Sequence, residues 1–304
     1  LRVRKMTHAV RERFQLGQNI ETYVFLDFGT TGFYPEDDQS NKSPIPNVVD
    51  PRIVEIGMVA VERSDFEEAV TKIEKKEDFE SIAAVFTCPV NHGLTGDELD
   101  EHLLRIQPAQ EVHTFSEEKC FGEEWSDVKL FLDGLKKPIC FVALGGSEFH
   151  FRVLLSELQR AHIDLQESLK NCFFADSISA FTITDHVYYH RIKDMDTTNS
   201  INQKKQLKSE DPFQDLEINN WPFAIKARFQ PCFIRKDDGD WSFSESSYKK
   251  VKKSYKIEVL YQSIFGESFS AHNTVDNCKA VLKLCLAFNT AAYFDKSSGR
   301  LVDL

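Results

Sequence analysis

Short apolar runs alternate with amphipathic stretches along most of the chain. Runs rich in aromatic and β-branched residues predict strands. These runs cover residues 23–34, 53–63, 81–90, 139–146 and 172–177. Apolar residues at helical spacing predict helices over residues 123–135, 151–163, 255–266 and 277–288. Strands that alternate with helices are typical of the α/β class, which we therefore expect for this chain.

Three segments depart from this alternation. Residues 1–21 include a basic stretch and predict an N-terminal arm or helix ahead of one large domain over 22–304. Residues 65–80 mix acidic and basic side chains, so we expect a solvated connector there. Residues 190–250 show no helical period, and the Asp-Asp-Gly-Asp sequence at 237–240 predicts a hairpin. We therefore expect a β-rich insertion, whose alternating aromatic residues favour a packed minor sheet over an exposed interface.

Composition narrows the class of protein. The 304 residues carry 37 Lys and Arg against 48 Asp and Glu, and the net charge of −11 argues against non-specific wrapping of DNA. Seven cysteines without a C-x-x-C pair are typical of reduced thiols in a cytoplasmic or nuclear protein, not of a disulfide framework or zinc site. No apolar run approaches the roughly 18 residues of a membrane span, so we expect no membrane partner. The first residues lack a starting methionine and a signal-peptide core, which suggests a piece of a longer protein.

Four segments, in this order, resemble the DEDDh 3′–5′ exonucleases, and within them the TREX-type enzymes. VFLDFGTTGF resembles the family's strand that ends in D-x-E-[TA]-T-G, and CFVALGGSEFHFRVLLSEL resembles its V-A-H-N-G segment with the helix that follows. FADSISAF and SYKIEVLYQSIFGESFSAHNTVDNCKAVL resemble two further motifs, the second of which carries H-x-x-x-x-D. The segments cover residues 24–33, 140–158, 174–181 and 254–282. The resemblance implies an RNase H-like fold, in which helices flank a mixed central sheet of about five strands.

The chemistry that the resemblance implies is phosphodiester hydrolysis by two divalent cations, which four carboxylates hold while a histidine activates water. In this chain Asp27 matches the first carboxylate and His272 matches the general base. Gly29, His150 and Asn277 stand where the family has its other carboxylates. One carboxylate carries too little negative charge for a pair of magnesium ions. We therefore expect a relic pocket with no metal, no cofactor and no catalysis.

Two nearby carboxylates could rebuild such a site. Glu148 lies two residues before His150, and Asp276 lies beside Asn277, although one helical position turns a side chain by about 100°. His150 and His272 would suit zinc, but two uncharged histidines are the simpler interpretation. A rebuilt site would use Mg²⁺ or Mn²⁺ and would leave a residual 3′–5′ exonuclease.

Two sets of residues are candidates for nucleic-acid binding. Thr30 and Thr31 belong to the turn that, by the resemblance, approaches the terminal nucleotide; the alternative is a tight exit from the strand. A dense run of lysines could neutralise phosphates, or could be a solvated loop of an acidic protein. This run consists of Lys249, Lys250, Lys252 and Lys253.

The sequence leaves three functions open. The first is a catalytically inactive TREX-like domain that acts as a protein-interaction scaffold in a nucleic-acid pathway, with a second copy of the chain as one candidate partner through an edge strand. The second is a module that binds single-stranded DNA or RNA without cutting it, which the loss of carboxylates would favour by lowering phosphate repulsion. The third is the residual nuclease. Salt-dependent binding to single-stranded oligonucleotides distinguishes the first two.

Overall fold

The computed structural model describes most of the chain between Asn19 and Leu301. The described residues are 19–34, 50–75, 82–91, 93, 118–199, 220–237, 241–251, 254–270 and 273–301. Residues 1–18 of the expected N-terminal arm, together with Lys252, Lys253 and His272, lie outside them.

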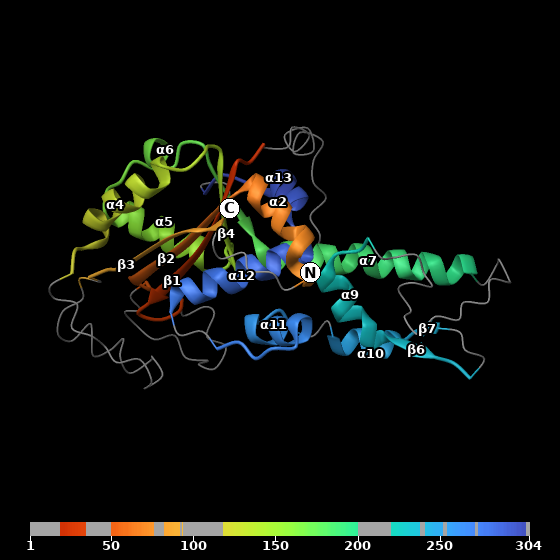
Figure 1. Ribbon diagram of the computed structural model, residues 1–304. Coiled ribbons are helices and arrows are strands. Elements are labelled where there is room, and N and C mark those ends of the chain that lie inside the picture. The colour runs from red at the N-terminus through yellow and green to blue at the C-terminus, as the bar shows by residue number, and fades with distance from the viewer. Residues whose placement is uncertain are drawn as a thin grey trace, which may run out of the picture.

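A mixed five-stranded sheet forms the centre of the fold (Figure 1). Its strands are β1 (Thr22–Thr30), β2 (Ile53–Glu62), β3 (Ala84–Pro89), β4 (Ile139–Ala143) and β5 (Cys172–Asp176). The spatial order is β3-β2-β1-β4-β5. β1, β2 and β3 pair antiparallel, whereas β1, β4 and β5 pair parallel. The expected α/β class and RNase H-like architecture are thereby confirmed.

Helices cover both faces of this sheet. α12 (Thr274–Phe288) packs against β1 and β2 on one face, and α4 (Phe121–Asp133) and α5 (His150–Arg160) cover the other. Because successive strand residues point to opposite faces, Tyr23 joins the buried cluster around α12, and Val24 joins the cluster around α4 and α5. Each face of the sheet therefore has its own core.

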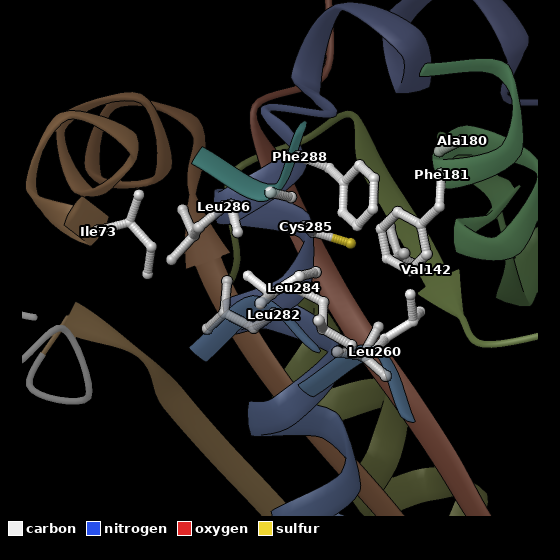
Figure 2. Packing of buried hydrophobic residues seen from close by; sticks show 14 of the residues in the cluster. Ile73, Val142, Ala180, Phe181, Leu260, Leu282, Leu284, Cys285, Leu286 and Phe288 are labelled. Carbon is white, nitrogen blue, oxygen red and sulfur yellow. The ribbon is translucent and has the colours of Figure 1, made fainter. Parts of the chain in front are cut away.

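Figure 2 shows the core around α12. Cys285 and Phe288 of this helix lie among side chains of β4 and of α7 (Ser177–Asn199). The rings of Phe288 and Phe181 stack with their centroids 4.4 Å apart. α12 is thus held on both sides along its C-terminal half, which leaves its polar first turn at the edge of the sheet.

The prediction of a solvated connector over residues 65–80 is wrong for the first half of this segment. α2 (Arg63–Lys72) follows β2 directly and buries Phe66 and Ala69 in the core around α12. These two apolar residues are three positions apart, a helical spacing, and burial of Phe66 outweighs the surrounding charge.

The insertion at 190–250 contains the expected hairpin but is not rich in β-structure in its described part. β6 (Phe233–Arg235) and β7 (Trp241–Phe243) form the hairpin on either side of residues 237–240. Around them lie the end of α7, α9 (Phe223–Phe229) and α10 (Glu245–Val251). Seven-residue helices are too short to give a clear period, which explains why the sequence predicted strands.

The aromatic residues of the insertion are packed, as expected. Buried side chains pack with half-buried ones in the cluster around α12. The six are Trp221, Phe223, Phe229, Phe233, Trp241 and Phe243.

A buried ion pair fixes the insertion to α7. Nη2 of Arg228 in α9 donates to Oδ2 of Asp185 in α7 at 2.9 Å, and both side chains are almost fully buried. The hydroxyl of Tyr255 donates to the same Oδ2 at 2.7 Å. Three segments far apart in the sequence therefore meet at one carboxylate.

Three more α-helices and two short 3₁₀ helices complete the described fold. They are α6 (Leu165–Ser168), α11 (Ile257–Phe265), α13 (Ala291–Ser297), Ile73–Lys75 and Gln230–Cys232. All seven cysteines are free thiols, as the sequence predicts. Among the described helices, none combines the length and the apolar character that crossing a membrane requires. The cytoplasmic or nuclear location stays a prediction.

Candidate functional site

The candidate site lies where the C-terminal half of β1 meets the first turn of α12. Asp27 of β1 pairs with Gly57 of β2. A Cβ atom on Gly57 would lie only 2.3 Å from Oγ1 of Thr274, so the missing side chain lets α12 begin directly on the sheet. The thiol of Cys278 also donates to the Gly57 carbonyl oxygen at 3.3 Å. This close approach brings the first turn of α12 beside Asp27.

Both carboxylate oxygens of Asp27 have hydrogen-bond partners. Oδ1 lies 2.8 Å from Nε2 of His150, the first residue of α5. Oδ2 accepts a hydrogen bond of 2.8 Å from Nδ2 of Asn277 in α12. The structure therefore brings together three of the five positions that the sequence singled out, and His150 and Asn277, where the resemblance places carboxylates, both face Asp27.

The geometry of His150 indicates which ring nitrogen carries the hydrogen. Its Nδ1 is buried and has no partner among the described residues. The side chain lies between Phe28 and Phe149, whose ring centroids are 6.1 and 5.4 Å from that of the imidazole. A hydrogen on Nε2 gives Asp27 its donor and leaves no buried N–H unpaired on the other side of the ring.

Gly29 faces a carboxylate that the sequence analysis missed. Gly29 pairs directly with Glu55 of β2, and directly opposed residues of antiparallel strands point to the same face. A Cβ on Gly29 would lie 3.1 Å from Cβ of Glu55. Burial, and then the nearby charge of Asp27, raises the pKa of the Cys278 thiol well above its usual value, and Glu55 adds to this effect. A glutamate at position 29 would meet Glu55 at once; only the strand register, which the sequence did not give, could have revealed this.

Neither carboxylate considered as a replacement ligand belongs to a group of three or more potential metal ligands in the described ranges. Glu148 is exposed in the turn before α5, where its backbone oxygen accepts a hydrogen bond from Arg152. Asp276 donates its backbone N–H to Oδ1 of Asn273 at the start of α12. The structure gives the rebuilt site no support.

The described donor set does not fit two magnesium or manganese ions. No group of three or more His, Cys, Asp or Glu side chains that could hold a metal occurs in the described ranges, and His272 lies outside them. Such ions require several oxygen ligands, whereas the oxygens of Asp27 already face two nitrogen donors. No step that runs through a metal is derived from this arrangement.

Thr30 and Thr31 close the exit from β1. The buried Thr31 donates its backbone N–H to the carbonyl oxygen of Arg52 at 2.9 Å, and its Oγ1 accepts the N–H of Arg52 at 3.0 Å. Oγ1 of Thr30 donates to the carbonyl oxygen of Gly32 at 3.0 Å. Of the two interpretations, the geometry favours the tight exit from the strand.

The lysine run is not brought to Asp27. Lys249 and Lys250 are exposed at the end of α10, and Figure 1 places α10 well away from the N-terminal end of α12. The nearby Tyr248 is buried and stacks on Tyr189, so it is not available to a base. Lys252 and Lys253 lie outside the described residues.

An exposed aromatic surface, which the sequence analysis did not identify, borders the site instead. The side chain of Phe33 is 76% exposed, and its ring centroid lies 5.4 Å from that of Phe149, the neighbour of His150. Phe149 also meets the edge of Tyr34, over which the guanidinium of Arg152 lies at 4.0 Å. The positions of Phe33 just after Thr-Thr-Gly, and of Phe149 just before His150, were the only signals in the sequence.

Comparisons with known proteins give matches of fold only. No family model and no curated protein matches the chain. Similar solved structures include E. coli exonuclease I in complex with a dA16 oligonucleotide, at 13% identity and a TM-score of 0.41 over 90% of this chain and 42% of that one. A zinc-bound complex of the same enzyme with single-stranded DNA has 13% identity and a TM-score of 0.45 over 93% and 42%. A 3′-exonuclease that recognises the 3′ end of the histone mRNA stem-loop has 10% identity and a TM-score of 0.42 over 94% and 74%.

The chain thus spans less than half of the E. coli exonuclease I chain. At these identities and TM-scores no activity is transferred. The fold assignment rests on the strand order and strand directions of this chain.

Proposed function

We propose that this chain is a degenerate, non-cleaving relative of the DEDDh exonucleases, TREX-like in its motifs, that binds single-stranded nucleic acid. The observation that carries the proposal is the contact of both Asp27 oxygens with His150 and Asn277. Charge stabilisation by cations supplies most of the rate in metal-assisted hydrolysis, so a site that cannot gather cations would bind without cutting.

The aromatic surface beside this site supports the binding part of the proposal. Phe33 offers an exposed ring, the half-buried Phe149 connects it to His150, and Arg152 adds a positive charge beside them. Bases stack on such rings without regard to sequence, and each stacked base contributes roughly 1–3 kcal/mol. An unpaired strand end is therefore a suitable ligand for this surface.

Fluorescence anisotropy with short 5′-labelled strands of DNA and RNA tests the proposal, with gels of the same samples in Mg²⁺ or Mn²⁺. We expect binding without digestion, and we expect Phe33→Ala to weaken binding by about 5- to 100-fold because one stacking contact is lost. Leu130→Ala is the matched control, since Leu130 is 74% exposed on α4 and should leave affinity unchanged.

Two results would contradict the proposal. Digestion that is lost in Asp27→Ala would mean that the chain is a residual nuclease. Equal affinities of the wild type and Phe33→Ala would mean that the aromatic surface does not bind the strand.

A protein-interaction scaffold is the second candidate function. Ile183 and Val187 are exposed and lie one turn apart on α7, and such apolar pairs occur in partner interfaces. If neither DNA nor RNA binds at low salt, this function becomes the better explanation. The homodimer through an edge strand stays a prediction from the sequence.

A further inference from the structure

We propose that Asp27, His150 and Asn277 form a clasp that holds the sheet and two helices together without any cation. The proposal concerns folding stability, so it stands or falls independently of nucleic-acid binding. It assigns a present role to positions that otherwise count only as losses.

The clasp joins elements from both layers of helices. Asp27 lies on β1 in the middle of the sheet, His150 begins α5 on one face, and Asn277 lies in the first turn of α12 on the other. Each carboxylate oxygen of Asp27 contacts one helix: Oδ1 lies 2.8 Å from Nε2 of His150, and Oδ2 lies 2.8 Å from Nδ2 of Asn277. One side chain therefore connects the starts of two helices that do not share a face of the sheet.

The chemistry of the three groups is complementary. Asp27 is an acceptor, and an imidazole Nε2–H and an amide Nδ2–H both point at it. Hydrogen bonds to an ionised acceptor are stronger than those between neutral groups, and burial increases the difference. The side chains of His150 and Asp27 are only 13% and 18% exposed, so water competes weakly for these bonds.

Carboxylates at the same positions would reverse the sign of the interaction. Acids at 150 and 277 would place two negative charges within hydrogen-bond distance of Asp27, on the face that also carries Glu55. Such a cluster repels itself at neutral pH unless a divalent cation or a shared proton neutralises it. With histidine and asparagine at these positions, β1, α5 and α12 are held together by hydrogen bonds and need no cation.

Thermal unfolding of the full chain, in EDTA and in millimolar Mn²⁺, tests the clasp. For the wild type we expect the same Tm in both buffers to within about 1 °C, because no cation binds the folded state. For the double variant His150→Asp with Asn277→Asp we expect a Tm lower by roughly 5–10 °C in EDTA, and Mn²⁺ should recover at least about half of the loss. Glu148 is an exposed carboxylate two residues before His150, so Glu148→Gln should leave the Tm unchanged both in EDTA and in Mn²⁺.

Milder variants keep the test decisive if the double variant does not fold. His150→Gln and Asn277→Leu differ in that only the first keeps a donor, so the Tm should fall by several degrees more for Asn277→Leu than for His150→Gln. A wild-type Tm that rises by several degrees in Mn²⁺, and no longer does so in Asp27→Asn, would overturn the proposal. Equal Tm values for the wild type and Asn277→Leu would overturn it as well.

Discussion

Asp27 and Asp185 each join three parts of the fold, but they do so in opposite electrostatic settings. Asp185 is fully buried and shares its charge with the guanidinium of Arg228 and the hydroxyl of Tyr255. Asp27 is partly exposed and is held by an amide and an imidazole. A carboxylate removed from water needs a counter-charge, whereas one that keeps some contact with solvent can be held by dipoles and the remaining solvent.

The two aspartates also differ in the role that the resemblance gives to their positions. The Asp185 cluster joins α7 to Arg228 of the insertion and to Tyr255, and the resemblance assigns none of these three residues to catalysis. The Asp27 cluster occupies positions that the resemblance assigns to catalysis, and we propose that it too has become structural. Three predictions sharpen this contrast.

The largest effect is expected at the buried pair. Arg228→Met leaves the Asp185 charge uncompensated in the core, which should lower the free energy of unfolding by about 3–5 kcal/mol. Urea denaturation followed by circular dichroism measures it. The double variant Asp185→Leu with Arg228→Met should recover much of the loss, because it removes the orphaned charge. If Arg228→Met lowers the free energy of unfolding by less than about 1 kcal/mol, the Asp185 carboxylate does not depend on Arg228 for its stabilisation.

A smaller effect is expected where α12 approaches Asp27. Gly57→Ala would drive a methyl group into Thr274, so the free energy of unfolding should fall by about 1–3 kcal/mol. Gly122→Ala is the matched control, because its Cβ would meet Ala161 at an ordinary 3.4 Å and alanine favours the helix. Equal stability of the two variants in urea would mean that α12 does not start directly on β2.

The smallest effect is a pH dependence beside the buried pair. Burial raises the pKa of Cys232 from 9.0 to about 11, and Arg228 opposes this shift. A raised pKa in the folded state means that the thiol stabilises the fold below pH 9, where it is protonated in both states, and that this contribution is lost as the pH rises towards about 11.

Cys232→Ala provides the comparison for this dependence. Melting curves between pH 7 and pH 11 should show the Tm advantage of the wild type shrink as the pH rises, since the variant has no thiol to titrate. A constant Tm difference across this range would contradict the expected shift.

The strands and most helices were predictable because their signals are local. Compact apolar runs placed β1 and β2 within a few residues, and the first run also takes in the tight turn that follows β1. The helical period of α5 was clear because this helix buries one stripe, whereas the C-terminal half of α12 is apolar and buried on nearly all sides. The prediction for the insertion was wrong because α9 and α10 have only seven residues each and the polar partners of the insertion lie far away in the sequence.

The sequence predicted which positions form the candidate site, but it did not predict the contacts between their side chains. The resemblance located Asp27 as a match to one pattern, and Gly29, His150 and Asn277 as departures from it. It did not indicate that His150 and Asn277 would bind Asp27, nor that Glu55 would face Gly29, because these contacts depend on strand register and helix placement. Thr31 was a candidate through the resemblance and the lysines through their charge; the burial of Thr31 and the distance of Lys249 and Lys250 from the site make these residues poor candidates.

The sequence by itself determined the order of the sheet strands and of the longer amphipathic helices, the α/β class, the free thiols and the presence of only one of the carboxylates that the resemblance implies, because each of these depends on residue identity or on spacing within one segment. Only the tertiary structure decided what the changed positions do. Hydrogen bonds between β1, α5 and α12 join residues more than 120 positions apart, and the glycine at position 57 allows the approach that makes one of them short. Side chains that share no local pattern became partners because the packing of two helical layers on one sheet directs them to the same carboxylate.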